Sequence, residues 1–194
     1  KNLLKQLDYP LAAPSANITT KVSAVKAKDV KEEFGTKIKY TLDGGTCAIG
    51  IESTIVNLIG RPSILRLGGL DILKIQKALG FKINTSINPN KKIAPGQSCL
   101  HYSPGIPLSM NVTKPKNNEA FIIIKKKKTK IKNYFYLTSK NNLDEAAKNL
   151  YSCLRKIKNE GYKSIAVEKI PNIGLGKAIN DRLKRASEFK IIKN

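Results

Sequence analysis

The apolar residues in the first part of the chain occur in short stretches that are separated by turn residues. Ile38, Tyr40 and Leu42 alternate with polar residues, which is the pattern of a half-buried strand. Leu70 and Leu73 are predicted to share the inward face of a helix. The elements expected before residue 84 are the end of a helix over 1–8, a helix over 29–34, strands over 38–42, 54–59 and 63–67, and a helix over 70–79.

The last part of the chain contains longer elements with clearer periods. Between Leu143 and Asn159 apolar residues recur at helical spacing, and Gly161 follows as a helix-ending residue. Strands are expected over 120–124, 134–137 and 164–167, and helices over 143–159 and 176–189. This strand–strand–helix–strand–helix order predicts an α/β unit in which helices pack on a sheet.

Residues 84–107 show neither pattern and contain four prolines, so we expect an irregular linker there. His101 and Tyr102 lie in this segment, and a passive tether needs neither residue type. The pattern therefore divides the chain into three parts: residues 1–83, a linker over 84–107, and a small α/β unit over 108–194.

Charge adds a question about partners. The chain carries 36 Lys+Arg against 14 Asp+Glu, a formal net charge of +22. Such an excess favours a nucleic-acid partner, because basic surfaces neutralise phosphates. The alternative is a general compositional bias toward lysine, since a surface that reads phosphates more often uses arginine. We favour the compositional interpretation over direct tRNA binding.

Composition also indicates the cellular compartment in which we expect the protein. No apolar run approaches the roughly 20 residues that span a bilayer, and the first residues lack a signal-peptide pattern. The cysteines Cys47, Cys99 and Cys153 are odd in number and far apart, which fits a reducing compartment. We expect a soluble cytoplasmic protein. Because the chain begins with lysine and its single methionine is Met110, we also expect it to be part of a longer product.

Four segments have compositions that suit a binding site as well as a structural role. Residues 10–17 and 43–56 combine small residues, turns and hydroxyls that let an anion approach the backbone, although both also read as ordinary turns. Arg66 is either an edge residue with its charge in solvent or a clamp for phosphate or carboxylate. His101 is the only histidine and has no array of ligands around it, so no metal site is predicted. The residues alone thus predict an α/β protein with a candidate anion or nucleotide site.

A set of motifs then identifies a family. The order and spacing of these motifs across nearly the whole chain resemble the Sua5/YrdC family, and the last two are typical of its two-domain Sua5 form. The motifs are APSAN at 13–17, LDGG at 42–45, GIESTIV at 50–56, ILRLG at 64–68, APG with HYSP between 94 and 104, and GLGKAINDRL at 174–183.

The resemblance implies a fold and an activity. Residues 1–83 resemble the C-terminal part of the YrdC catalytic domain, an open twisted sheet around a concave site, and residues 108–194 resemble the small Rossmann-like Sua5 domain. The family condenses L-threonine, bicarbonate and ATP into threonylcarbamoyl-adenylate and pyrophosphate, with Mg²⁺ as the usual divalent cation. Partner proteins then transfer the threonylcarbamoyl group to an adenosine of tRNA.

The resemblance also implies roles for individual residues. Ser53 matches the hydroxyl that binds threonine. Arg66 matches the arginine that faces the ATP phosphates, although Leu67 follows it where the family usually has proline. The implied ATP-binding residues are Ala13, Ser15, Ser23, Arg66 and Tyr102. The implied supporting residues are Asn17, Thr54 and His101. Tyr102 is predicted to close over the nucleotide, with simple packing between the domains as the alternative.

The N-terminal half of the YrdC domain, with its basic residues for ATP, has no counterpart in this sequence. The primary hypothesis is therefore a threonylcarbamoyl-adenylate synthase represented by an incomplete chain. The alternative is a non-catalytic nucleic-acid-binding or regulatory module related to the family, as the charge of +22 would allow.

Overall fold

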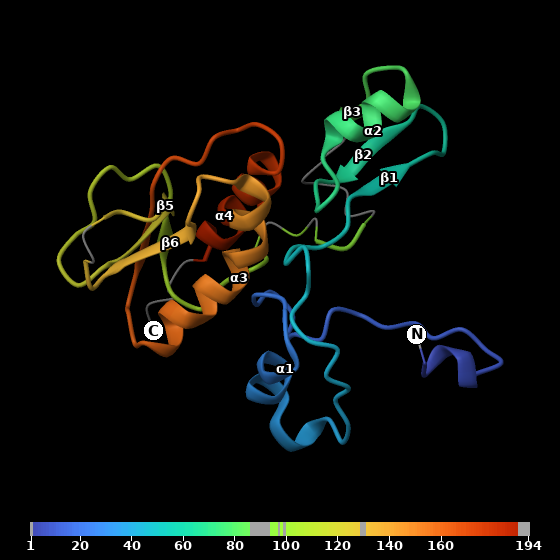
Figure 1. Ribbon diagram of the computed structural model, residues 1–194, viewed down its shortest axis with the longest axis horizontal. Coiled ribbons are helices and arrows are strands. Elements are labelled where there is room, and N and C mark those ends of the chain that lie inside the picture. The colour runs from blue at the N-terminus through green and yellow to red at the C-terminus, as the bar shows by residue number, and fades with distance from the viewer. Residues whose placement is uncertain (1, 86–93, 97, 99, 129–130, 190–194) are drawn as a thin grey trace.

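The computed structural model describes residues 2–85, 94–96, 98, 100–128 and 131–189. Three lobes are visible in Figure 1: an α/β unit that contains the C-terminal elements, a small lobe around β1–β3, and an N-terminal segment that contains α1. This arrangement confirms the α/β class that the element order predicted.

The C-terminal unit is built on a parallel sheet in the order β4-β7-β5-β6. Its strands are β4 (Leu108–Ser109), β5 (Ala120–Lys125), β6 (Tyr134–Thr138) and β7 (Ile165–Val167). The register pairs Phe121 with Tyr134 and Ala120 with Ile165. The three longer strands confirm the prediction, whereas the two-residue β4 was missed because it lies within a proline-rich stretch.

Two helices cover one face of this sheet, α3 (Leu143–Asn159) and α4 (Gly176–Ser187). The structure confirms the predicted bounds of α3. Its N-terminus is capped by the Asn142 side chain, which accepts hydrogen bonds from the backbone N–H groups of Asp144 and Glu145. Leu150, Ile157 and other apolar residues of α3 share a core with Ile122 and Leu137 of the sheet. The opposite face of the sheet has a smaller cluster of Phe121, Ile123 and Ala166, with Val112 and Tyr134 against it.

The lobe before the linker is a three-stranded sheet in the order β1-β2-β3, with one helix. Its elements are β1 (Ile55–Asn57), β2 (Ser63–Arg66), α2 (Ile72–Leu79) and β3 (Asn84–Thr85). β1 and β2 are antiparallel, and β2 and β3 are parallel. The core of this lobe is small and consists of Ile64, Ile72 and Ile83 with partly buried neighbours.

The predicted inward face of α2 was wrong. The helix begins after Asp71, whose side chain accepts a hydrogen bond from the backbone N–H of Leu73 and caps it. Leu70 therefore lies outside the helix and is 51% exposed, and Leu73 is 60% exposed. Ile72 packs on the sheet instead. The capping Asp71 sets where the helix begins, and thereby which of its residues face the sheet, whereas the apolar spacing alone did not.

The N-terminal segment contains less regular structure than predicted. The helix expected over 1–8 is only a 3₁₀ turn, η1 (Leu4–Gln6), and no strand forms over residues 38–42. Tyr40 and Leu42 are each 80% exposed, so the alternating pattern has no partner strand and no covering layer among the described residues. The helix predicted over 29–34 is confirmed as α1 (Ala27–Phe34), followed by the 3₁₀ turn η2 (Gly35–Lys37).

Of the predicted linker, residues 94–96, 98 and 100–107 form neither helix nor strand, apart from an isolated bridge at Ser103. Residues 86–93, 97 and 99 lie outside the described residues. The predicted linker does include one regular piece, since its first two residues form β3. Farther along, Ser103 pairs with the N-terminal segment: its carbonyl accepts from the N–H of Val22, and its N–H donates to the carbonyl of Thr20. The linker is thus anchored to the first part of the chain.

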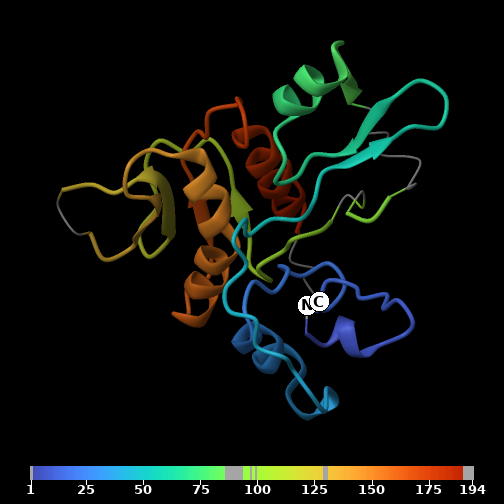
Figure 2. The ribbon, with the colours of Figure 1, turned by 45° about the vertical axis from the view of Figure 1, so that its right-hand side comes forward.

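The segment before β1 packs against the C-terminal unit, as both ribbon views show (Figures 1 and 2). Gly50 lies so close to α3 that a Cβ at this position would be 2.3 Å from the Lys148 carbonyl oxygen. Its φ of +82° also favours glycine. Val22, Val25 and Ile51 join the core that α3 and α4 form with the sheet. Residues of the segment before β1 and residues of the C-terminal unit therefore share one core.

No helix in the described ranges combines the length and apolar character that crossing a membrane requires.

Candidate active site

The residues implied by the resemblance fall into two places. Ala13 and Ser15 lie in an exposed loop, and Asn17 at its end is half-buried. Asn17 braces this loop: its backbone N–H donates to the carbonyl of Ser15, and its side-chain amide donates to the carbonyls of Ile18 and Lys21. The loop is thus held from its C-terminal end, while its small residues face solvent.

The second place is centred on Arg66, at the end of β2. Its Nε donates to the backbone carbonyl of Ser53 at 3.0 Å, and its Nη2 donates to the Ser53 hydroxyl at 3.2 Å. Its Nη1 donates to the carbonyl of Pro95 at 3.2 Å. The arginine therefore joins the segment before β1 to the linker, and it orients the Ser53 hydroxyl, which remains exposed.

Thr54 supports the same corner from the other side. Its hydroxyl donates to the carbonyl of Leu70 at 2.7 Å and accepts from the N–H of the same residue at 3.3 Å. Both polar groups of the Leu70 backbone are thereby tied to the start of β1. The Thr54 hydroxyl thus holds the backbone of Leu70, and its supporting role in a binding site stays a prediction.

The linker reaches this corner through Gly96. A Cβ at Gly96 would lie 2.5 Å from the Tyr102 hydroxyl oxygen and 3.2 Å from Cδ of Arg66. The φ of Gly96 is +83°, so a larger residue would be strained as well as crowded. Gly96 therefore lies in contact with both Arg66 and Tyr102, two of the residues to which the resemblance assigns ATP binding.

Tyr102 itself is buried. Its side chain is 1% exposed, and its ring stacks on Tyr151 with the centroids 5.7 Å apart. The guanidinium carbon of Arg182 lies 4.9 Å from the centre of the Tyr102 ring, a cation–π distance. In this structure Tyr102 is a packing residue between the two parts of the chain, and its contact with a nucleotide stays a prediction.

His101 contacts the neighbouring ring. The two ring centroids are 4.0 Å apart, and Nδ1 of His101 accepts a hydrogen bond from the backbone N–H of Tyr102. Burial lowers the pKa of His101; the Glu52 carboxylate opposes this effect, and three nearby arginines add to it. The pKa therefore lies below its usual value, and the neutral imidazole needed to accept that hydrogen bond is favoured.

Sequence reasoning missed the most densely hydrogen-bonded group at this corner, the carboxylate of Glu52. It accepts from the Ser23 hydroxyl at 2.6 Å, from the Tyr151 hydroxyl at 2.9 Å and from Nε of Arg182 at 3.1 Å. Burial raises the pKa of Glu52, but the charge of Arg182 and the hydrogen bonds outweigh burial and bring the pKa below its ordinary value. Ser23 is engaged here, and its contact with ATP stays a prediction.

Arg182 of α4 completes this group. Its side chain is fully buried, and besides Glu52 it contacts the Asp181 carboxylate at 2.9 Å. Burial lowers its pKa, whereas the surrounding tyrosines and carboxylates raise it, and the net direction is upward. Arg182 is therefore a permanent buried cation. Glu52 and Arg182 both belong to recognised motifs, but no local pattern pairs two residues 130 positions apart.

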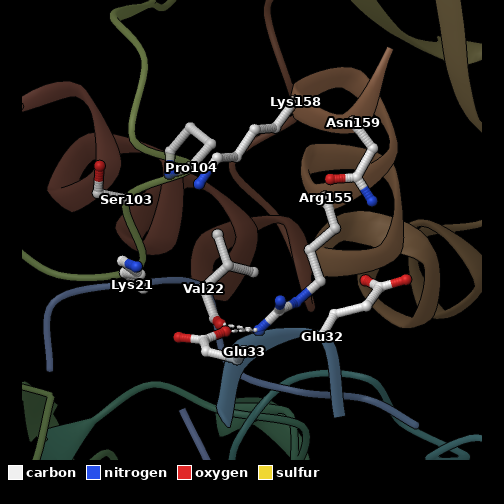
Figure 3. Close-up of a pocket in the computed structure, with 9 residues that line it drawn as sticks. All are labelled: Lys21, Val22, Glu32, Glu33, Ser103, Pro104, Arg155, Lys158 and Asn159. Carbon is white, nitrogen blue, oxygen red and sulfur yellow. Dashed lines mark hydrogen bonds and ion pairs between the residues drawn. The ribbon is translucent and has the colours of Figure 1, made fainter. Parts of the chain in front are cut away.

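A separate cavity of about 170 Å³ lies between α1, the linker and α3. Figure 3 shows Arg155 reaching across it to Glu33, at 2.7 Å, and to the carbonyl of Val22. None of the residues that line this cavity is among those predicted for the site. The ion pair of Arg155 with Glu33 makes this cavity the place of a second ionic contact between the C-terminal unit and the segment before β1.

Comparison with known proteins gives the family. Residues 70–188 match the family described as "Threonylcarbamoyl-AMP synthase, C-terminal domain", and residues 1–68 match the Sua5–YciO–YrdC family, described as "Telomere recombination". The chain belongs to the threonylcarbamoyl-AMP synthase family. This finding confirms the resemblance inferred from the motifs.

Individual members of the family are similar over nearly all of this chain. The threonylcarbamoyl-AMP synthase of Pyrococcus abyssi is 33% identical over 98% of the chain, and that of Bacillus subtilis is 29% identical over 98%. A crystal structure of P. abyssi Sua5 complexed with L-threonine covers 90% of the chain with a TM-score of 0.76 and 31% identity. A solved structure of a variant of the same protein gives a TM-score of 0.70.

The chain is shorter than these synthases. It spans 62% of the P. abyssi relative, 61% of the B. subtilis relative and 57% of the P. abyssi structure. The two family matches meet at residues 68–70, whereas α2, which follows that point, packs on β2 through Ile72 and Ile64. The domain limits of 1–83, 84–107 and 108–194 stay a prediction.

Within the described residues, no three His, Cys, Asp or Glu side chains come together in a way that could hold a metal ion. The carboxylate of Glu52 is occupied by Arg182, Ser23 and Tyr151. The residues that the structure describes therefore do not fit a protein-built Mg²⁺ site.

Proposed function

We propose that the complete protein to which this chain belongs is an L-threonylcarbamoyladenylate synthase. It condenses L-threonine, bicarbonate and ATP into threonylcarbamoyl-AMP and pyrophosphate. The observation that carries the proposal is the Arg66 fork, which fixes the Ser53 hydroxyl and the linker at one corner in a member of the threonylcarbamoyl-AMP synthase family.

Ser53 is the proposed threonine contact. Its hydroxyl accepts from Arg66, so its own hydrogen is directed away from the arginine and toward solvent. A substrate amine or carboxylate can therefore meet a pre-oriented hydroxyl. A solved structure of P. abyssi Sua5 is a complex with L-threonine, which supports threonine as the amino-acid substrate.

Arg66 is the proposed phosphate contact. A guanidinium has five N–H donors. Arg66 forms three hydrogen bonds, to Ser53 and Pro95, and its other two donors have no partner among the described residues and are proposed to meet an anion. The fork is thus fixed by the protein before substrate arrives, and a preorganised cation stabilises the charge that develops on transferred phosphate oxygens.

The loop with Ala13 and Ser15 is the second part of the proposed ATP site, and Asn17 braces it. Its small, exposed residues let a nucleotide approach the backbone closely. Tyr102 and His101 complete the proposed set from the linker. Condensation of three substrates needs no protein nucleophile; holding the substrates together and neutralising phosphate charge supplies the acceleration.

Mg²⁺ belongs to the proposal only as an ion that accompanies ATP. Mg²⁺ commonly binds nucleotide phosphates and water with few protein ligands. Since the described residues do not fit a protein-built site, no step of the reaction is assigned to the ion.

We place the reaction in the cytoplasm and assign transfer of the threonylcarbamoyl group to tRNA to separate proteins downstream. The two cysteines that the structure describes, Cys47 and Cys153, are free thiols, which supports a reducing compartment. The proposed synthase forms its product without tRNA, so the site needs no nucleic-acid surface.

The test measures threonylcarbamoyl-AMP formed by the complete protein from L-threonine, bicarbonate and ATP, without tRNA. We expect Ser53→Ala to raise the KM for threonine and Arg66→Ala to weaken the use of ATP, each by about ten- to a hundredfold, the effect of one lost charge-assisted hydrogen bond. Thr113→Ala, an exposed position remote from the site, serves as the control. Unchanged kinetics in both site variants would remove these residues from the proposal.

A further inference from the structure

We propose that Arg182 is a positioning residue for the threonine and ATP site, acting from the C-terminal unit through Glu52 and Tyr102. This inference rests on the proposed function. Two series of contacts start at Arg182 and meet at Arg66. Together they form a closed ring that includes Ser53 and the linker.

The first series of contacts runs through Glu52. Arg182 donates to the Glu52 carboxylate, which also accepts from Ser23 and Tyr151, so the side chain is fixed by three partners. The backbone carbonyl of Glu52 accepts from the N–H of Gly69 at 2.8 Å. Ser53 follows directly in the chain. The backbone of Ser53 is thus fixed on one side by the partly buried Glu52 and on the other by the hydrogen bond from Arg66.

The second series of contacts runs through the linker. The guanidinium of Arg182 lies against the face of Tyr102, whose hydroxyl lies against Gly96. The preceding residue, Pro95, accepts a hydrogen bond from Arg66. Arg66 is therefore held at both ends of its fork by segments that each touch Arg182, Ser53 through Glu52 and Pro95 through Tyr102.

The burial of Arg182 indicates a role beyond stability. Nη2 of Arg182 and the hydroxyl of Tyr102 are buried and form no hydrogen bond with any described residue. An apolar side chain of similar size would fill this place without unpaired donors, and buried ion pairs often add little stability compared with such a replacement. An apolar residue could not donate the hydrogen bond to Glu52. Glu52 directly precedes Ser53, the proposed threonine contact.

The experiment uses the complete protein and three variants. Glu52→Gln removes one charge of the pair, and Glu52→Gln with Arg182→Gln removes both, so that neither is left buried alone; Asp181 keeps its contact with Arg185. Glu33→Gln is the matched control, because it weakens the other ionic contact between the two parts of the chain, to Arg155, at a place remote from Ser53.

We expect the two Glu52 variants to raise the KM for threonine about tenfold, the lower end for one weakened charge-assisted hydrogen bond. The thermal midpoint should fall most in the single Glu52 variant and recover in the double variant, while the KM remains raised. Glu33→Gln should lower the thermal midpoint and leave the KM unchanged. A double variant with an unchanged KM would overturn the proposal, since the ring would then be packing alone.

A second measurement separates this inference from the proposed function. Hydrogen exchange of the segments 50–56 and 64–69 should accelerate in the double variant and not in Glu33→Gln, whatever reaction the protein catalyses. Unchanged exchange would overturn the positioning role even if the wild-type protein makes threonylcarbamoyl-AMP. If exchange is faster in the double variant but the wild-type protein makes no threonylcarbamoyl-AMP, the proposed function is refuted and the positioning role of Arg182 stays in place.

Discussion

The two ends of this chain differ in how completely they bury their apolar side chains. In the C-terminal unit, α3 and α4 cover the parallel sheet, and Leu150, Ile157 and Leu183 are fully buried. Before residue 84, large apolar side chains remain in solvent, with Tyr40 80% exposed and Ile59 88% exposed. Large apolar residues are thus buried in the C-terminal unit and largely exposed in the region before residue 84.

The difference shows where each region obtains its core. Most residues of the core of the C-terminal unit lie within residues 108–189, whereas Val22, Val25 and Ile51 of the first region are buried by joining that core. The first region's own cluster around Ile64 is small. The longer relatives have residues that this chain lacks, and the exposed apolar side chains before residue 84 are where we expect such residues to pack.

Separation of the two regions would have the largest effect. We expect a fragment of residues 106–194 to unfold in one cooperative thermal transition, because it contains most of the residues of the larger core, and a fragment of residues 1–85 to show none. Circular dichroism and calorimetry on both fragments, with the whole chain as the reference, would measure this. A cooperative transition in the 1–85 fragment would break the comparison.

A pair of matched substitutions sharpens the same contrast. Leu150→Ala, at a fully buried position of α3, should lower the free energy of unfolding by about 2–5 kcal/mol, because it leaves a cavity. Leu73→Ala, at a position of α2 that is 60% exposed, should change it by less than about 0.5 kcal/mol. Urea denaturation of both variants measures the two values. Equal losses would mean that Leu73 is covered in solution.

The smallest expected effect is a pH dependence at the contact between the regions. Because Arg182 and the hydrogen bonds hold the pKa of Glu52 below its ordinary value of 4.5, ionised Glu52 stabilises the folded chain above pH 4.5. This contribution is lost as the pH falls from 4.5 through the lower pKa of the folded state. The difference in thermal midpoint between wild type and Glu52→Gln should therefore shrink in acid. A difference that is constant with pH would argue against an ionised Glu52.

The sequence predicted elements whose stability is local. The bounds of α3 were correct because a 17-residue amphipathic pattern, a capping Asn142 and Gly161 agree with one another. The strand over 38–42 was wrong because alternation predicts a strand only where a partner exists, and the alternating pattern cannot supply one. The face of α2 was wrong because the capping Asp71, and not apolar spacing, sets where that helix begins.

The candidate site divides in the same way. Ser53 and Arg66 could be proposed because each lies in a recognisable motif, and the structure brings them together. Glu52 and Arg182 lie in the same motifs, yet their pairing depends on how α4 docks against the segment before β1. Docking of distant segments is a property of the packed molecule, and a single sequence carries no local signal for it.

The contact between Glu52 and Arg182 also has an evolutionary consequence. A family member that exchanged its C-terminal unit with that of a relative would receive the relative's residue at position 182 as the neighbour of Tyr102 and Glu52. The exchange would leave an unpaired buried charge unless both sides of the contact matched. Recombination between relatives is therefore expected to keep the two sides of this contact together as one heritable unit.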